Sequence, residues 1–295
     1  MSQLIDNLNT IESVKTDIKS AIENKGVDMT GVSFPGYASK IGEISGGGGW
    51  DQKDITEKSY EIINLDNSAS FVASRVFNGN KTIQTVNLPY ATKVYDFAFY
   101  ACGLLSQVNL PMCSILYSYA FGYCYSLTQV SLPVCSIISD YAFDGCSLLT
   151  KVNIPMCSII SQAAFRSCRL TQANLPMCSY IDLNGFQYCY SLSQVSLPVC
   201  SYIGDNAFNY CSPLSQVSLP VCSIIKGYAF KYCSSLSIIT IGYSSVCNLI
   251  NSMTFDHTQI TSSTGSIYVP ASLVDSYKSA KNWSYFSTQI FPIPE

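Results

Sequence analysis

Cysteine is the residue whose frequency and spacing suggest chemistry in this sequence. The 295 residues include fourteen cysteines, and the thirteen from Cys102 to Cys233 follow one another at intervals of eleven, with one interval of ten between Cys168 and Cys178. A thiol can act as a nucleophile, a metal ligand or half of a disulfide. A spacing this regular indicates a structural role first, because a catalytic or metal site needs its ligands once and close together.

Known arrangements for catalysis and metal binding are missing from the sequence. Zinc sites use closely spaced ligands such as C-x-x-C, yet no two cysteines are nearer than ten residues and His257 is the only histidine. His257 lies in "FDHTQ", where we expect it to be exposed or to form a minor hydrogen bond. There is no G-x-S-x-G, P-loop, H-E-x-x-H or D-x-D-x-D-G motif. We therefore expect no catalytic residue, no metal site and no cofactor, and predict that the chain is not an enzyme.

Carboxylates in the repeat do not form a catalytic pair by their spacing. Most lie near the loop before an Ala-Phe dipeptide, where aspartate commonly forms turns. These residues are Asp96, Asp140, Asp144, Asp182 and Asp205.

The cysteines belong to a longer repeat with a period of 22 residues. Aligning the Leu-Pro and Ile-Pro pairs gives one column, which Ile241 continues after one deletion. Self-similarity at 20 to 50 residues indicates a solenoid. In one unit Leu127, Val130, Leu132, Cys135 and Ile137 match the pattern L-x-x-L-x-L-x-x-N/C-x-L of leucine-rich repeats. The column consists of Leu88, Leu110, Leu132, Ile154, Leu175, Leu197, Leu219 and Ile241.

Each unit predicts one short strand. Val130 and Leu132 point to one face of it, and Gln129 and Ser131 to the other. Stacked units then form a parallel sheet whose strands lie roughly 4.8 Å apart. In-register cysteines would have parallel side chains, so their Cβ atoms lie too far apart for a disulfide, and we predict buried free thiols.

Phenylalanines recur once in each unit, and we expect them to stack as a buried spine. They are Phe99, Phe121, Phe143, Phe165, Phe186, Phe208 and Phe230.

The second half of each unit carries a resemblance to a known family. The segments "YAFDGC", "YAFGYC", "NAFNYC" and "YAFKYC" resemble the BspA-like branch of bacterial leucine-rich repeats, in which an Ala-Phe-x-x-Cys segment forms the back of the coil. The resemblance covers about residues 67–291. It departs at Gly185, which replaces the Ala, and in "FVASRVFNGN", where Val76 and Asn80 take the Ala and Cys places. We interpret this first unit as part of an N-terminal cap.

Residues 1–45 lie outside the repeat and predict a helical anchor or oligomerisation segment. An apolar stripe recurs at three- and four-residue steps over a helix of about 22 residues, and Gly26 provides a stop. Such a stripe needs a partner, which is either the rest of this chain, a second copy or a larger assembly. The stripe consists of Leu4, Leu8, Ile11, Val14, Ile18 and Ile22.

The same segment is similar to amino-terminal pieces of tail, fibre and other structural proteins of bacteriophages. This similarity implies other virion proteins as partners of residues 1–45, and a homo-oligomer. A glycine-rich linker follows at residues 46–50. The predicted order is therefore an anchor, a linker and a displayed repeat domain at residues 51–291, with caps at 51–87 and 242–291.

The C-terminal segment "GSIYVPASLVDSYKSAKNWSYFSTQIFPI" resembles the closing element of BspA-like proteins. We expect "SIYVP" to be the last strand, ended by Pro270, and Ser272 to cap a short helix containing Leu273, Tyr277 and Ala280. This helix would cover the open end of the sheet.

Composition limits the partners. Only 12% of residues are charged and the net charge is −3, so the clustered Lys and Arg that bind nucleic acid are missing. No stretch has the roughly 18 apolar residues of a membrane span, and the amino terminus does not have the pattern of a signal peptide. We expect no nucleic acid, no membrane insertion, and synthesis in the cytoplasm.

Uncharged polar and aromatic side chains remain as the candidate binding surface. Amides, hydroxyls and tyrosine rings can bind glycans or proteins, or they can solvate and stiffen a repetitive sheet. The predicted outward ladder of the strands is Gln107, Gln129, Lys151, Gln172, Gln194 and Gln216. The predicted tyrosine columns are Tyr119, Tyr141 and Tyr228, and Tyr123, Tyr188, Tyr210 and Tyr232.

Three functions fit these observations. The missing leader, the linker and the resemblances at the two ends favour a bacteriophage virion protein, of fibre or decoration type, that attaches to a host-surface glycan or protein. The alternatives are a BspA-like adhesin on the bacterial cell surface and an intracellular scaffold that binds another protein.

Overall fold

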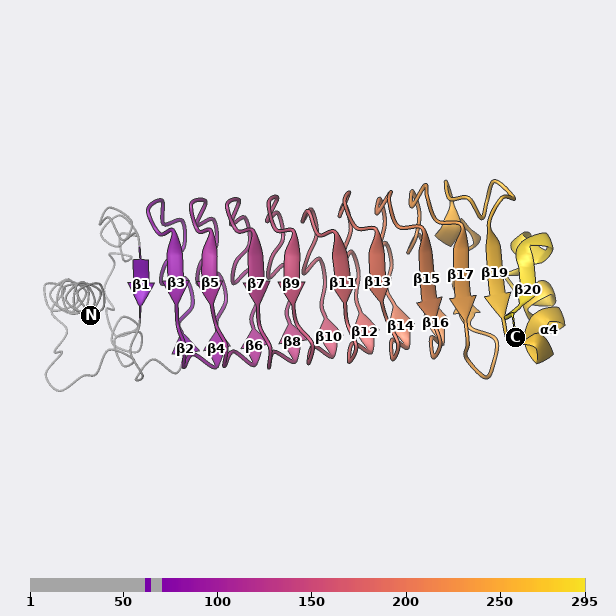
Figure 1. Ribbon diagram of the computed structural model, residues 1–295, viewed down its shortest axis with the longest axis horizontal. Coiled ribbons are helices and arrows are strands. Elements are labelled where there is room, and N and C mark those ends of the chain that lie inside the picture. The colour runs from indigo at the N-terminus through magenta and orange to yellow at the C-terminus, as the bar shows by residue number, and fades with distance from the viewer. Residues whose placement is uncertain (1–61, 65–70, 295) are drawn as a thin grey trace, which may run out of the picture.

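A computed structural model describes residues 62–64 and 71–294. The predicted anchor, the linker and residues 51–61 of the predicted N-terminal cap lie outside the described residues. The described chain winds into an elongated solenoid in which each turn contributes two strands (Figure 1). All of its strand pairs are parallel, which confirms the predicted repeat solenoid.

The first strand of each turn is three or four residues long, and we call these the front strands. They are β1 (Ile62–Asn64), β3 (Thr85–Asn87), β5 (Gln107–Asn109), β7 (Gln129–Ser131), β9 (Lys151–Asn153), β11 (Gln172–Asn174), β13 (Gln194–Ser196), β15 (Gln216–Leu219), β17 (Ile238–Ile241), β19 (Ser266–Val269) and β20 (Ile290–Pro292).

A second strand of two residues follows in most turns, and together these form one continuous nine-stranded sheet. They are β2 (Phe71–Val72), β4 (Lys93–Val94), β6 (Ile115–Leu116), β8 (Ile137–Ile138), β10 (Ile159–Ile160), β12 (Tyr180–Ile181), β14 (Tyr202–Ile203), β16 (Ile224–Ile225) and β18 (Asn248–Leu249).

This second sheet was not predicted, and it corrects one position of the repeat pattern. The pattern match puts Ile137 at the last leucine position, but Ile137 is only half-buried, whereas Ile138 is fully buried. The reason is the alternation of a strand: once Ile137 and Ile138 form β8, their side chains must point to opposite faces. The signal was present in the sequence, because pairs of β-branched residues favour strands.

Strand register follows the predicted period. Ile115 pairs with Ile137, 22 residues later, and Ile159 pairs with Tyr180, 21 residues later. The shorter step reflects the deletion between Cys168 and Leu170 in the loop that leads into β11.

Front strands do not form one uninterrupted sheet. The hydrogen-bonded order is β1-β3-β5-β7-β9, then β11-β13, then β15-β17-β19-β20. The first interruption lies directly after the shortened loop, whereas the second, between β13 and β15, separates units of equal length. The ladder of front strands is therefore interrupted at two places, although the strands on either side of each interruption still lie side by side (Figure 1).

The core is a column of stacked rings, as predicted. Phe77, Phe99 and their counterparts through Phe255 stack nearly parallel, with successive ring centroids 5.1 to 5.9 Å apart. All seven phenylalanines of the predicted spine have no exposed surface. Each ring buries its faces against the neighbouring turns, so no turn is stable alone.

The C-terminal cap differs in detail from its prediction. β19 covers "SIYV" and ends at Pro270 as expected, but β20 follows it, so β19 is not the last strand. Ser272 is not a helix cap, because it lies inside a 3-10 turn, Ala271–Leu273, and α4 (Val274–Ser279) begins after that turn without a side-chain cap. Two further 3-10 segments are Ser252–Phe255 and Ser284–Gln289.

Large side chains of this cap close the end of the core. Tyr277 and Trp283 are buried. Cys247 links them, since its backbone N–H donates to the Tyr277 hydroxyl (2.8 Å) and its carbonyl accepts from Trp283 Nε1 (2.6 Å). Phe286 meets Phe255 edge to face at 5.4 Å. The cap therefore covers the last ring of the spine.

Candidate binding surface

The turn segments hold a first column of cysteines by hydrogen bonds rather than by sulfur chemistry. Each thiol donates to the backbone carbonyl of a spine phenylalanine in the preceding turn, at 3.0 to 3.3 Å between sulfur and oxygen. Burial raises the pKa of these thiols, to about 12 for Cys102, Cys146 and Cys189. A neutral buried thiol is a poor nucleophile. The column is Cys102, Cys124, Cys146, Cys168, Cys189, Cys211 and Cys233.

The second cysteine column is satisfied within its own turn. Each thiol donates to the carbonyl two residues later, at 3.3 to 3.4 Å. Burial raises the pKa of Cys135 and Cys178 to about 11. All fourteen cysteines of the chain are free and buried, which confirms the predicted free thiols. The second column is Cys113, Cys135, Cys157, Cys178, Cys200 and Cys222.

All seven tyrosines of the predicted columns adopt an unusual backbone conformation, with φ between 56° and 64°. Residues other than glycine rarely take positive φ, which costs on the order of 1 kcal/mol. Where the neighbouring turn carries an aromatic residue at the same place, ring stacking offsets this cost. Tyr119 stacks on Tyr141 at 4.6 Å, and Tyr210 stacks on Tyr232 at 4.3 Å.

Both predicted columns are divided in the structure. Tyr228 shares its place in the turn with Tyr119 and Tyr141, but the turns between them carry Ala163, Asn184 and Asn206 at this place. In the other column Gly145 and Ser167 separate Tyr123 from Tyr188. From Tyr188 onward this column is continuous to His257, which stacks on Tyr232 at 4.4 Å.

Stacking decides what these tyrosines can bind. A sugar packs against the flat face of an aromatic ring, but a ring inside a column has its faces against the rings of neighbouring turns. Only ring edges and hydroxyls remain for a ligand. The tyrosine columns therefore fit a stabilising role better than a binding platform.

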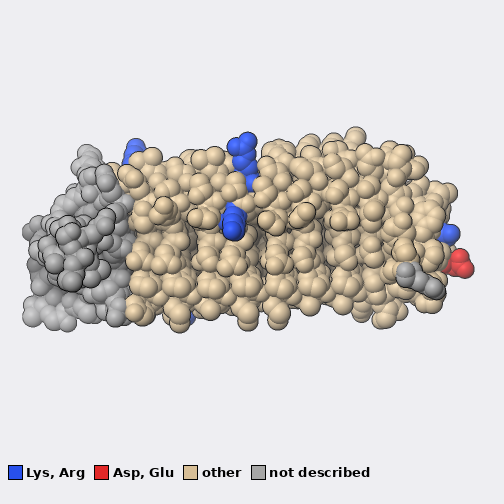
Figure 2. Space-filling view, viewed as in Figure 1, with Lys and Arg blue, Asp and Glu red and all other residues tan. Residues whose placement is uncertain are grey.

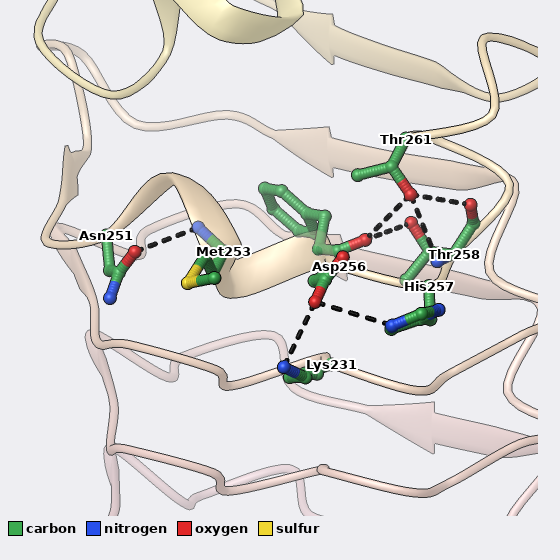
Figure 3. A network of polar contacts seen from close by, with 8 residues as sticks. Lys231, Asn251, Met253, Asp256, His257, Thr258 and Thr261 are labelled. Atoms are coloured by element: carbon green, nitrogen blue, oxygen red, sulfur yellow. Dashed lines mark hydrogen bonds and ion pairs between the residues drawn. The ribbon is translucent and has the colours of Figure 1, made fainter.

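A small polar network terminates the second tyrosine column (Figure 3). Asp256 pairs with Lys231 (3.0 Å) and lies 3.6 Å from Nε2 of His257, whose side chain is 58% exposed, in agreement with the predicted exposure. Thr258 and Thr261 donate to the carbonyl of Phe255 at 2.6 and 3.3 Å. These contacts hold the last turn in place.

One buried ion pair was missed by the sequence analysis. Asp144, 2% exposed, accepts two hydrogen bonds from Arg166 of the next turn, from Nε at 2.9 Å and from Nη2 at 2.7 Å. The contact raises the pKa of Arg166. Its signal was the separation of 22 residues, which places opposite charges on adjacent turns. Lys231 and Asp256 occupy the corresponding places near the C-terminal end.

The carboxylates expected to form turns also bind across turns. Asp96, Asp140 and Asp205 each accept a backbone N–H of the following turn, at 3.0 to 3.1 Å. These carboxylates are engaged in holding turns together. In the described ranges, no group of three or more His, Cys, Asp or Glu lies together in a way that could hold a metal ion.

The outward ladder of the front strands behaves differently. Its six predicted residues are all exposed, one on each strand from β5 to β15. None of the six side chains has a hydrogen bond or ion pair to another described residue. Their neighbours pair only in part, as Asn109 does with Asn87 (2.7 Å) and Asn153 with Ser131 (3.0 Å). We call this outward surface of β5 to β15 the strand face.

Two depressions lie on the strand face, and each includes a place where the strand ladder is interrupted. The first has a volume of about 570 Å³ and is lined by residues of β5, β7, β9 and β11. The second, of about 470 Å³, is lined by residues of β11, β13 and β15 and of the loops before β13 and β15. Figure 2 shows few Lys and Arg side chains in this view, and Asp and Glu only near the C-terminal end. The strand face thus offers hollow, polar and nearly uncharged sites.

An exposed apolar stripe also runs along the solenoid, between the front strands and the short strands, and sequence analysis did not identify it. Its side chains are 39% to 53% exposed. The signal was their common position, directly after the proline of each Leu-Pro or Ile-Pro pair. They are Tyr90, Met112, Val134, Met156, Met177, Val199 and Val221.

The 22-residue turns, the buried leucine column and the parallel front strands define a leucine-rich repeat protein. The family model described as "BspA type Leucine rich repeat region" matches residues 55–169 and 158–280, which together are more than half of the chain. The chain therefore belongs to the BspA-type leucine-rich repeat family, as its resemblance indicated.

One solved structure shares the fold, and a second is similar in part. A leucine-rich repeat protein from Bacteroides ovatus is 18% identical with a TM-score of 0.52, and the match covers 79% of this chain and 66% of that protein, slightly under two thirds of its length. A leucine-rich repeat protein of T. pallidum is 24% identical over 52% of this chain and 78% of its own, with a TM-score of 0.49. No curated protein sequence matches the chain. The described residues include no helix long and apolar enough to cross a membrane.

Proposed function

We propose that this protein is a non-enzymatic attachment protein whose strand face binds a glycan or protein on a cell surface. The observation that carries the proposal is the unpaired ladder of the strand face. Side chains that are exposed, aligned and without internal partners are available to a ligand, whereas the ladders of thiols and tyrosines already have partners.

The chemistry of the strand face suits a hydroxyl-rich ligand. Amide groups donate and accept hydrogen bonds at the same time, as sugar hydroxyls do. The two depressions fall within the usual volume of small-molecule sites, roughly 300 to 1,000 Å³. A glycan is therefore the first ligand class to test, and a protein the second.

Two places of display are compatible with this function. The anchor-like stripe of residues 1–45 and the linker at 46–50 support a bacteriophage virion protein. In this proposal the protein joins other virion proteins through residues 1–45 and forms a homo-oligomer. Membership of the BspA-type family is compatible with an adhesin on a bacterial cell surface. We favour the virion, with the bacterial surface as the alternative.

A binding assay with the full-length chain tests the attachment function. The double variant Gln129→Glu/Gln194→Glu adds two exposed carboxylates on separate turns of the strand face, and we expect it to lose binding to host cells. The control Ser147→Glu/Ser234→Glu adds the same charge at exposed residues that follow the first cysteine column, and should bind as wild type. Equal binding by all three proteins would exclude the strand face.

Immunogold labelling distinguishes the places of display. Antibody to residues 50–295 should label purified phage particles if the protein is a virion component. Gold on the envelopes of uninfected bacteria alone would instead support the adhesin.

A further inference from the structure

Lys151 is the only charged residue in the front strands that the structure describes. It lies on β9, in the ladder position that glutamine occupies on β5, β7, β11, β13 and β15. Its side chain is exposed and has no ion pair with the described part of the chain. A single cation therefore interrupts an otherwise neutral ladder.

The two carboxylates closest to Lys151 in the sequence already have partners. Asp144, in the turn segment that precedes β9, is held by Arg166, and Asp140 accepts the backbone N–H of Gln162. Both acids are thus engaged with the following turn. The positive charge of Lys151 remains available to an external anion.

Lys151 lines the larger depression, of about 570 Å³, which includes the interruption between β9 and β11. The same depression is lined by the amides of Gln129, Asn153 and Gln172 and the hydroxyl of Ser131, while valines form the apolar part of the lining. The smaller depression, of about 470 Å³, has the same chemistry without a charge.

We propose that the depression around Lys151 binds a sugar that carries a carboxylate, such as a uronic or sialic acid. The ammonium group pairs with the carboxylate, and the surrounding amides and hydroxyl bond the sugar hydroxyls. An acidic peptide fits less well, because the lining has no aromatic pocket to anchor a side chain. This inference rests on the proposed attachment function and names the chemical class of its ligand.

Matched variants isolate the charge. Lys151→Gln makes this turn like five others, so the variant should fold, and Lys151→Arg retains the cation. Gln194→Lys moves a cation into the neutral depression. The probes are 3′-sialyllactose against lactose, and tri-galacturonic acid against its methyl ester, so each pair tests one source of the carboxylate.

Calorimetric titration of the full-length chain should show that at least one acidic probe binds tighter than its neutral counterpart, by about fivefold, the scale of an exposed ion pair. Lys151→Gln should remove this preference and Lys151→Arg should retain it. Gln194→Lys should add a second acidic site, and the preference should weaken as salt screens the charges.

Three results would overturn the inference: no binding of either acidic probe at millimolar concentration, equal affinity for acidic and neutral probes, or a preference unchanged in Lys151→Gln. The host-cell assay separates this failure from failure of the attachment function. If wild type binds cells and Gln129→Glu/Gln194→Glu does not, attachment stands and only the acidic ligand is wrong.

Discussion

The strand face and the turn segments repeat with the same period but use their side chains in opposite ways. In the turn segments, thiols, aromatic rings and carboxylates each bind the neighbouring turn, as Cys146 does through Phe121 and Asp144 through Arg166. On the strand face, Gln129 and its counterparts bind nothing within the described chain. Repetition therefore stabilises one side of the solenoid and leaves the other available for a ligand.

This difference explains how a chain with few charges holds many cysteines without using their reactivity. A repeated side chain lies next to its own copy in every turn. A residue type that stacks on its copy, or donates a hydrogen bond to a nearby carbonyl, can therefore stabilise the whole column. Thiol-to-carbonyl hydrogen bonds and ring stacking meet this condition. Amides that project away from the strands into solvent need no partner within the chain, because water can bond them.

Alkaline pH should give the largest effect, because it acts on the turn side at many positions together. Folding raises the pKa of Cys135 and Cys178 from 9.0 to about 11 and that of Cys102 and Cys146 to about 12. Below about pH 9 both states keep the proton and the stability is complete. Above it the unfolded chain ionises first, so the free energy of unfolding falls by about 1.4 kcal/mol per pH unit for each such thiol.

Denaturant titrations under reducing conditions from pH 7 to pH 11 measure this loss. We expect a nearly constant midpoint up to about pH 8.5 and a steep fall above it. The variant Cys178→Ala should show a shallower fall. A midpoint that stays constant to pH 10.5 would contradict the buried thiol columns.

The phenylalanine spine should show the largest effect of a single substitution. Phe165→Ala removes a fully buried ring between two stacked neighbours, and we expect a loss of about 3 to 5 kcal/mol in the free energy of unfolding. Guanidinium unfolding followed by circular dichroism measures it. A loss below about 1 kcal/mol would mean that the spine does not hold the turns together.

The buried ion pair should have an intermediate effect. Asp144→Asn keeps the shape of the side chain but leaves Arg166 without its anion, and we expect a loss of about 1 to 2 kcal/mol in thermal unfolding, because the arginine is partly exposed. The matched variant Lys231→Gln breaks the more exposed pair with Asp256, where solvent screens the charges, and should cost less. The reverse order would show that burial does not distinguish the two pairs.

The strand face should show the smallest effect on stability. Replacing Gln172 and Gln194 together by Ala should change the free energy of unfolding by no more than about 0.5 kcal/mol for each residue. The same variant should weaken attachment to host cells. A large loss of stability would mean that the ladder is structural, and the contrast between the two sides would fail.

Much of this fold could be predicted from the sequence, because every unit of the repeat has the same pattern of apolar and polar positions. The column from Leu88 to Ile241, the spine from Phe99 to Phe230 and the free buried thiols follow from period, polarity and spacing alone. The outward position of Gln129 follows from strand alternation. Resemblance to the BspA-type family agreed with these predictions and did not replace them.

Other features depend on contacts between residues of adjacent turns, and the sequence alone does not give these contacts. The burial of Ile138 in place of Ile137 requires the second sheet, and the 3-10 turn that contains Ser272 precedes α4 in the cap that closes over Phe255. The pairing of Asp144 with Arg166 depends on the distance between adjacent turns. The depressions of the strand face depend on where the ladder is interrupted.

The sequence by itself therefore determined the repeat, its core and the residues that face outward, since each is set by composition and period. Only the tertiary structure decided which ladders of side chains have partners within the described chain and which are available to a ligand. Stacking covers the ring faces of Tyr210 and Tyr232, whereas the Lys151 side chain has no hydrogen bond or ion pair within the described chain. The physical reason is that the hydrogen-bond or stacking partner of a side chain comes from the adjacent turn, which is close in space but about 22 residues away along the chain.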